Sequence, residues 1–148
     1  MQAETALNSW REWKGQLGTR PTILGPLSGG LSNQSFLLES AGQKMVLRIN
    51  GADTNLPNSD RSSEARIWQA AGDAGIAPAL SYVDEQGRFL VSTYIENDLP
   101  AKPHHDARLV DQALDLLDQC HRLTVKAPPI DYSRHIEQYW QIVESKKT

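Results

Sequence analysis

The sequence predicts an α+β fold, in which a strand-rich region with one main helix precedes two amphipathic helices. Three observations predict it. In residues 44–50, Met45, Leu47 and Ile49 alternate with side chains of the opposite face, which is the two-residue period of a strand. Apolar side chains recur at helical spacing in residues 61–74. Beyond residue 104 the helical period continues almost to the end of the chain.

A short helix is expected before the first strand. Four apolar side chains within residues 1–20 recur at helical spacing: Leu7, Trp10, Trp13 and Leu17. Gly18 and Pro21 are expected to end this helix. Strands are then expected at residues 22–27, 34–39 and 44–50, with residues 41–43 as a hairpin connection.

A second helix is expected after the polar loop that follows the third strand. Asn58, Ser59 and Asp60 are each able to cap its N-terminus, and Gly75 is expected to end it. Its apolar face is expected to consist of Ile67, Trp68, Ala71 and Ala74. Two more strands are expected at residues 80–83 and 89–94, joined by a turn at residues 84–87.

Residues 97–103 are predicted to form a hinge or linker, because they are polar and contain prolines. Residues 21–96 would then form one unit, and residues 104–148 would begin another with two helices. The apolar stripes of these helices are Leu109, Ala113, Leu116, Leu117, Cys120 and Leu123 in the first, and Ile136, Tyr139, Trp140 and Val143 in the second. Each stripe needs a cover, so we expect these faces to bind a second copy of the chain or a further lobe.

The composition excludes several classes of protein. The chain has 148 residues, with 15 basic and 18 acidic side chains and a formal net charge of −3. Binding of nucleic acid is not expected, because it needs a clustered positive surplus. The only cysteine, Cys120, excludes an internal disulfide framework. No stretch approaches the roughly 18 apolar residues of a membrane span, so we expect a cytoplasmic protein without a membrane partner.

The segment Ser28-Gly29-Gly30-Leu31-Ser32-Asn33 is the strongest local motif. Two glycines between strands let the backbone approach a ligand closely and present its N–H groups, and the neighbouring side chains add further donors. Such a loop is able to cover phosphate groups. A simple turn between two strands is the alternative interpretation.

Arg48 and Glu64 are candidates for a functional ion pair. Arg48 lies mid-strand on the face opposite Met45, Leu47 and Ile49, where it needs a carboxylate, a phosphate or water. Glu64 lies near the start of the next helix. A pair between them would fix the guanidinium so that it grips phosphate oxygens. Alternatively, Arg48 extends to solvent and Glu64 only favours the helix dipole.

The order of these motifs resembles the aminoglycoside phosphotransferase / choline kinase family, which has a protein-kinase-like fold. The matching segments are residues 27–33 (LSGGLSN), 46–49 (VLRI), 61–64 (RSSE), 75–78 (GIAP), 91–96 (VSTYIE) and 120–123 (CHRL). The Gly-Gly-Leu-Ser-Asn form is most similar to the choline- and thiamine-kinase-like branch. The resemblance implies a five-stranded antiparallel sheet with one main helix, forming an N-terminal lobe, followed by the first helices of an incomplete C-terminal lobe.

The resemblance also implies the residues that bind ATP. The phosphates would be covered by the loop residues Ser28, Gly29, Gly30, Ser32 and Asn33. Arg48 would replace the usual strand lysine on the α- and β-phosphates, held by Glu64. Val46 would cover the adenine. The hinge that pairs with the adenine edge would be Thr93, Tyr94, Ile95 and Glu96.

The catalytic part of the family's motif set is not recognised in this sequence. The family uses a His-x-Asp-x-x-x-x-Asn loop and a later Asp, and the last two bind Mg²⁺. The nearest match, His104-His105-Asp106 followed by Asp111, comes too early and opens a helix. We therefore expect no catalytic residue in this chain, and Mg²⁺ ligands only in the rest of the C-terminal lobe. A metal site at His104, His105, Asp106, Cys120 and His121 is the alternative, although Cys120 is expected to be a small core residue.

The resemblance implies an ATP-dependent kinase that transfers the γ-phosphate to a hydroxyl of a small, cationic acceptor such as choline, thiamine or an aminoglycoside. Residues 84–118 carry eight acidic and three basic side chains, a net charge of −5, which would attract such an acceptor or would simply form a solvated helix face. The chain alone is expected to be inactive. The alternatives are a nucleotide-binding or regulatory module, half of a split kinase, or an interaction domain.

Overall fold

Five antiparallel strands form one sheet, in the spatial order β1-β2-β3-β5-β4. The computed structural model describes residues 2–15, 17–28, 33–51, 60–97, 106–129 and 131–145. The strands are β1 (Thr22–Leu27), β2 (Gln34–Ser40), β3 (Gln43–Ile49), β4 (Leu80–Val83) and β5 (Phe89–Thr93). Helix α2 (Arg61–Asp73) lies between β3 and β4 in the chain, so the α+β fold class predicted from the sequence is confirmed.

The hairpin between β2 and β3 has a two-residue loop. Ser40 pairs with Gln43, which leaves only Ala41 and Gly42 in the turn. Both have a positive φ, of 49° and 81°. That is the combination a type I′ turn requires, and its twist matches that of the flanking strands. The predicted loop was one residue too long, because Gln43 already pairs with β2.

The two faces of β3 have different surroundings. Met45, Leu47 and Ile49 are buried in the apolar core. Val46 and Arg48 point to the opposite face, together with the residues paired with them in the neighbouring strands: Ser35, Leu37, Leu90 and Ser92. The predicted alternation is therefore confirmed, and it directs Arg48 away from the core.

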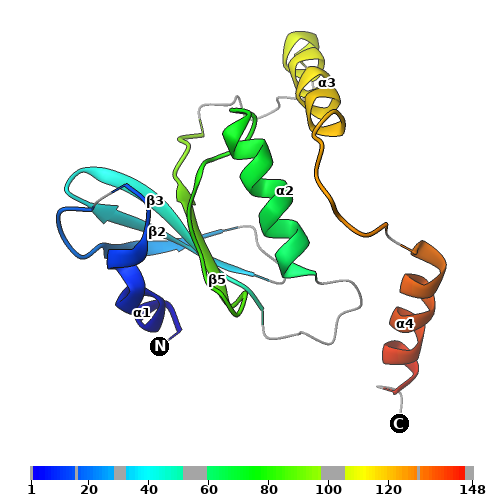
Figure 1. Cartoon of the computed structure of the whole chain (residues 1–148), viewed down its shortest axis with the longest axis horizontal. Coiled ribbons are helices and arrows are strands. Elements are labelled where there is room, and N and C mark those ends of the chain that lie inside the picture. The colour runs from blue at the N-terminus through cyan, green and yellow to red at the C-terminus, as the bar shows by residue number, and fades with distance from the viewer. Residues whose placement is uncertain are drawn as a thin grey trace.

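The N-terminal segment covers the core face of the sheet, whereas α2 lies on the other side (Figure 1). The N-terminal segment consists of α1 (Gln2–Ala6) and the 3₁₀ helix η1 (Leu7–Glu12). The prediction of a helix up to residue 17 was wrong. Trp13 is extended, and the Lys14 N–H donates to the Ser81 carbonyl at 2.8 Å, so the chain joins strand β4 instead of continuing the helix.

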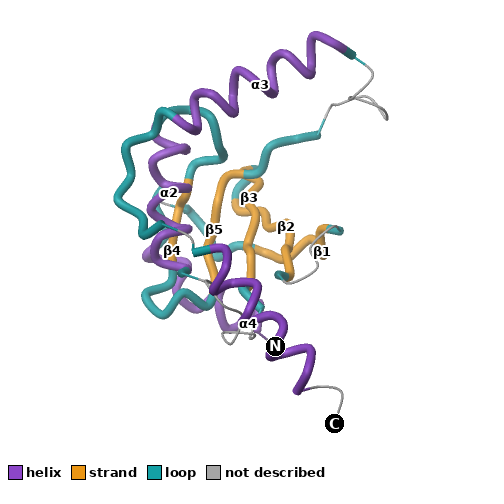
Figure 2. The backbone as a smooth tube through the Cα atoms, turned by 90° about the vertical axis from the view of Figure 1, so that its right-hand side faces the viewer, coloured by secondary structure: helices purple, strands orange, loops and turns teal. Residues whose placement is uncertain are grey.

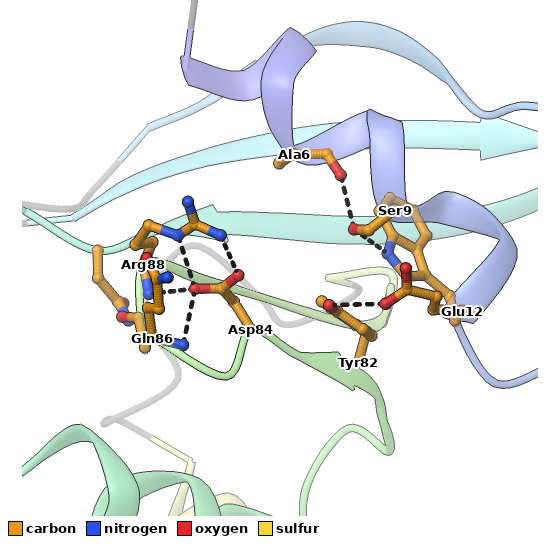
Figure 3. Close-up of polar contacts among 10 residues, drawn as sticks. Ala6, Ser9, Glu12, Tyr82, Asp84, Gln86 and Arg88 are labelled. Carbon is orange, nitrogen blue, oxygen red and sulfur yellow. Dashed lines mark hydrogen bonds and ion pairs between the residues drawn. The ribbon is translucent and has the colours of Figure 1, made fainter.

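An aromatic row joins this segment to the sheet. The Tyr82 ring stacks on Phe89, with centroids 5.6 Å apart, and lies 6.4 Å from the Trp13 ring. The Tyr82 hydroxyl also hydrogen-bonds to the Glu12 carboxylate at 3.1 Å (Figure 3). These contacts hold the edge strand β4 against the N-terminal segment.

Helix α2 has clear start and stop signals. Asp60, one of three candidate caps, accepts a hydrogen bond from the Ser63 N–H at 3.0 Å. Gly75 follows the helix with a φ of +75°. The predicted apolar face was partly wrong, because Ile67 and Ala74 are exposed while Ala71 is buried and Trp68 half-buried. The helix is rotated so that the side of Glu64 and Trp68 faces the sheet.

Two further helices, α3 (Ala107–His121) and α4 (Tyr132–Ser145), stand apart from the sheet in Figure 1, and Figure 2 shows the separation of α3 from a second side. No residue of α3 is buried. Large apolar side chains are exposed on both helices, among them Leu114, Leu117, Ile136 and Trp140. Cys120 is also exposed, so its predicted place in a core was wrong for this structure. None of the described helices is long and apolar enough to cross a membrane.

Candidate functional site

Arg48 and Glu64 form the ion pair that the sequence predicted. Arg48 Nη2 lies 2.7 Å from Glu64 Oε1. The alternation of β3 directs Arg48 toward α2, and Glu64 lies in the first turn of that helix. The Arg48 side chain is only 15% exposed and that of Glu64 is 36% exposed. The pair therefore lies at the margin between the sheet and solvent.

The guanidinium of Arg48 keeps a donor that no described residue satisfies. Nη2 has the Glu64 carboxylate as its partner, at 2.7 Å. Nε is buried and has no hydrogen-bond partner among the described residues. Buried donors without acceptors are costly, and charged ones more so. An anionic ligand would satisfy Nε.

Arg61 is a third member of the cluster. Its Nη1 lies 2.9 Å from Glu64 Oε2, and its Nη2 donates to Asn33 Oδ1 at 3.4 Å. The same Asn33 oxygen accepts a hydrogen bond from the Gly51 N–H at 3.2 Å. Arg61 thus connects Glu64 to the last residue of the glycine motif. Sequence reasoning missed this role, although the three-residue spacing of Arg61 and Glu64 on a helix is a signal for such a pair.

The charges in the cluster leave a positive surplus. Burial raises the pKa of Glu64, but the contacts with Arg61 and Arg48 outweigh it, so the pKa lies below its ordinary value and Glu64 is ionised at neutral pH. One carboxylate then faces two guanidinium groups. The excess of one positive charge favours an anion at this place.

Trp68 completes the surroundings of Arg48. The guanidinium carbon of Arg48 lies over the Trp68 ring, 5.2 Å from its centroid. This distance is within the range of cation–π contacts. The sequence analysis gave Trp68 only an apolar role. Its spacing of four residues from Glu64 is the signal that it shares the face of α2 that meets Arg48.

The other predicted binding residues are placed by the backbone. Ser28 follows β1 and Asn33 precedes β2, while Gly29, Gly30 and Ser32 lie outside the described residues. Val46 is half-buried on the face that carries Arg48. Through the pairs Leu27–Ser35 and Ser35–Arg48, the described residues Ser28 and Asn33 lie near the end of the sheet that carries Arg48.

The predicted hinge follows β5. Thr93 is the last residue of that strand, and its N–H donates to the Ala79 carbonyl at 3.0 Å. Tyr94 was expected in the strand but lies just after it, with its ring 5.7 Å from Lys44 Nζ. Ile95 and Glu96 are exposed.

The residues considered for catalysis or metal binding do not come together where they are described. His104 and His105 lie outside the described residues. Asp106 caps α3 by accepting a hydrogen bond from the Arg108 N–H at 3.0 Å, and Asp111 is exposed on that helix. Within the described part of the chain, no three His, Cys, Asp or Glu side chains form a group suited to a metal ion.

Comparison with known families supports the assignment from motifs. Residues 23–147 match the model of the phosphotransferase enzyme family (APH). The chain belongs to this family. The match thus confirms the family that the motifs indicated. It covers the glycine motif, Arg48, Glu64 and both C-terminal helices. A comparison with curated proteins gave no match.

Two solved structures share the fold. One is described as a choline/ethanolamine kinase family protein from Mesorhizobium loti, with a TM-score of 0.61 and 21% identity, covering 97% of this chain and 46% of that one. The other is an ethanolamine kinase from Plasmodium vivax, with a TM-score of 0.50 and 16% identity, covering 80% of this chain and 30% of that one. The expected protein-kinase-like N-terminal lobe is confirmed, and the chain spans less than half of either protein.

Proposed function

We propose that this chain is the nucleotide-binding part of an ATP-dependent kinase that phosphorylates a hydroxyl group of a small molecule. The observation that carries the proposal is the guanidinium of Arg48, which is held at Glu64 through Nη2 while its buried Nε lacks a hydrogen-bond partner among the described residues. A phosphate oxygen is the acceptor that such a donor suits best. In this role Arg48 binds the α- and β-phosphates.

The neighbouring residues have complementary roles in the proposal. The loop of Ser28, Gly29, Gly30, Ser32 and Asn33 covers the phosphates through its N–H groups and side chains. Val46 covers the adenine, and the backbone of Thr93, Tyr94, Ile95 and Glu96 pairs with its polar edge. In the proposal, residues 21–96 form the nucleotide-binding lobe, residues 97–103 the linker after the hinge, and residues 104–148 the start of a second lobe.

Mg²⁺ accompanies ATP in phosphoryl transfer, where it neutralises charge on the phosphates. In the described part of the chain, no three His, Cys, Asp or Glu side chains lie together in a group that could hold a metal ion. The ligands and the catalytic aspartate are proposed to belong to the rest of the C-terminal lobe. The isolated chain is accordingly proposed to bind nucleotide without transferring phosphate.

The acceptor is proposed to be a small alcohol that carries a positive charge, such as choline, thiamine or an aminoglycoside. Two observations support this class. Residues 84–118 have a net charge of −5, which favours a cation near the hinge. In addition, the two structures of this fold are described as belonging to choline/ethanolamine and ethanolamine kinases.

Calorimetric titration of the full chain with Mg-ATP tests the proposal. The wild-type chain is expected to bind, and Arg48→Met is expected to weaken binding at least about tenfold, because it removes charged donors. Arg20→Met is the matched control, since Arg20 pairs with Glu4 on the surface. Binding unchanged by Arg48→Met, or no binding by the wild-type chain at millimolar Mg-ATP, would overturn the proposal.

A further inference from the structure

Glu64, Trp68 and Gly72 follow one another at intervals of four residues in α2, so they lie on one face of the helix. Glu64 meets the guanidinium of Arg48 through its carboxylate, and Trp68 meets it through its ring. One helix face therefore contacts Arg48 at two successive turns.

The position of the Trp68 ring is itself fixed. Its indole Nε1–H donates to the Pro78 carbonyl at 2.8 Å. Gly72 allows this contact, because a Cβ at this position would come within 3.3 Å of Ala79 Cα and 3.4 Å of the Pro78 carbonyl oxygen. The absence of a side chain at Gly72 thus lets the backbone after α2 approach the helix. As a result, the ring that faces Arg48 is anchored at its polar end.

The two contacts constrain the guanidinium in different ways. The carboxylate of Glu64 holds one nitrogen, Nη2. The aromatic face of Trp68 instead attracts the delocalised positive charge of the whole guanidinium group. A guanidinium is more weakly hydrated than an ammonium and more often lies over an aromatic ring, so the contact with Trp68 gives a reason for arginine at position 48 in place of the lysine typical of kinases.

We propose that Trp68 is a positioning residue, which holds the guanidinium of Arg48 in the orientation that phosphate binding requires. This role rests on the proposed function, because it acts only through Arg48. Trp68 does not itself touch the nucleotide. Its removal should therefore weaken binding only when Arg48 is present.

A double-mutant cycle on Mg-ATP affinity tests this dependence. Trp68→Leu is expected to weaken binding about three- to tenfold in the wild-type background, in line with a cation–π contact at a partly buried site. In the Arg48→Met background, the same change should alter affinity less than about twofold. An equal loss in both backgrounds would show a purely structural role for Trp68 and overturn the inference, while the proposed function would stand. No binding by the wild-type chain would overturn both.

A spectroscopic measurement covers the case in which Trp68→Leu impairs folding. The ring of Trp68 should shift the NMR signal of the Arg48 Nε–H, which can be assigned from its loss in Arg48→Lys. Trp68→Phe keeps a smaller ring and should leave a reduced shift and most of the affinity. An Arg48 signal that does not move in Trp68→Phe would contradict the contact between the ring and the guanidinium and overturn the inference without any nucleotide present.

Discussion

Arg61 holds Glu64 through the carboxylate oxygen Oε2, at 2.9 Å, from one turn earlier in α2. This contact leaves the other oxygen, Oε1, to Arg48. The carboxylate is therefore fixed at both oxygens by two cations from different elements. Its orientation does not depend on Arg48 alone, so the proposed site would keep its geometry when a ligand binds to Arg48.

Glu64→Gln should destabilise the fold. The amide keeps the shape of the side chain but leaves two guanidinium groups without their shared anion, so we expect the free energy of unfolding to fall by about 1–3 kcal/mol. Urea denaturation at neutral pH measures the change. Glu137→Gln on the exposed surface of α4 is the control and should change the unfolding free energy by less than about 0.5 kcal/mol. Equal effects of the two changes would contradict a structural role for the shared carboxylate.

Arg61→Lys should weaken nucleotide binding although it keeps the charge. A lysine has no fork with which to bind Glu64 Oε2 and Asn33 Oδ1 together, so the end of the glycine motif loses its connection to α2. We expect an affinity loss of about threefold or more in calorimetric titration with Mg-ATP. Arg66→Lys, on an exposed position of the same helix, is the control. An unchanged affinity for Arg61→Lys would mean that charge alone suffices at this position.

Asp84→Asn should destabilise the turn between β4 and β5. The buried carboxylate accepts hydrogen bonds from the Gln86 N–H, the Arg88 N–H and the Arg88 side chain (Figure 3). An amide cannot accept all of these bonds, so we expect a loss of about 1–3 kcal/mol at pH 7, measured by urea denaturation. The neighbouring exposed Glu85→Gln should have little effect.

The effect of Asp84→Asn should also depend on pH. Hydrogen bonds from Arg88 hold the pKa of Asp84 below its ordinary value of 3.8, against the opposing effect of burial. Because the folded-state pKa is the lower one, the stabilisation is complete above pH 3.8 and is lost as the pH falls through the folded-state pKa. The difference in unfolding free energy between wild type and Asp84→Asn should therefore shrink as the pH falls below 3.8. A difference that stays constant down to pH 2 would contradict this assignment.

Ala41→Asn should stabilise the hairpin between β2 and β3. Ala41 has a φ of 49°, which is unfavourable for alanine and better tolerated by asparagine. The resulting Asn-Gly pair is the preferred one for this turn, so thermal denaturation should show a gain of about 0.5–1 kcal/mol. The same change at Ala70, inside α2, should instead destabilise the protein. A loss of stability at position 41 would contradict the turn type.

Much of the fold followed from local patterns. The alternation in β3 predicted both the buried side of the strand and the direction of Arg48, and the position of Glu64 at a helix start brought the two together. These predictions succeeded because period and capping are local properties. The N-terminal helix was predicted too long, because a hydrogen bond from Lys14 to the distant Ser81 ends it, and no local pattern contains that contact.

The contributions of Arg61 and Trp68 could not be predicted in the same way. Helical spacing shows which side chains share a face, but not which face the sheet covers. Ile67 was expected to be buried and is exposed, because α2 is rotated toward Glu64 and Trp68. The same face of α2 carries Gly72, where the backbone of Pro78 and Ala79 comes close, and helical spacing does not contain that contact.

The odd-numbered and even-numbered residues of β3 lie on opposite faces of the sheet and have different roles. Met45, Leu47 and Ile49 support the core, and Val46 and Arg48 lie on the opposite face, where we propose that the ligand binds. In a deep mutational scan, the odd positions should therefore control how much protein accumulates in the cell. Polar replacements of Arg48 should instead reduce ligand binding far more than abundance, so the dominant phenotype would alternate residue by residue along a single strand.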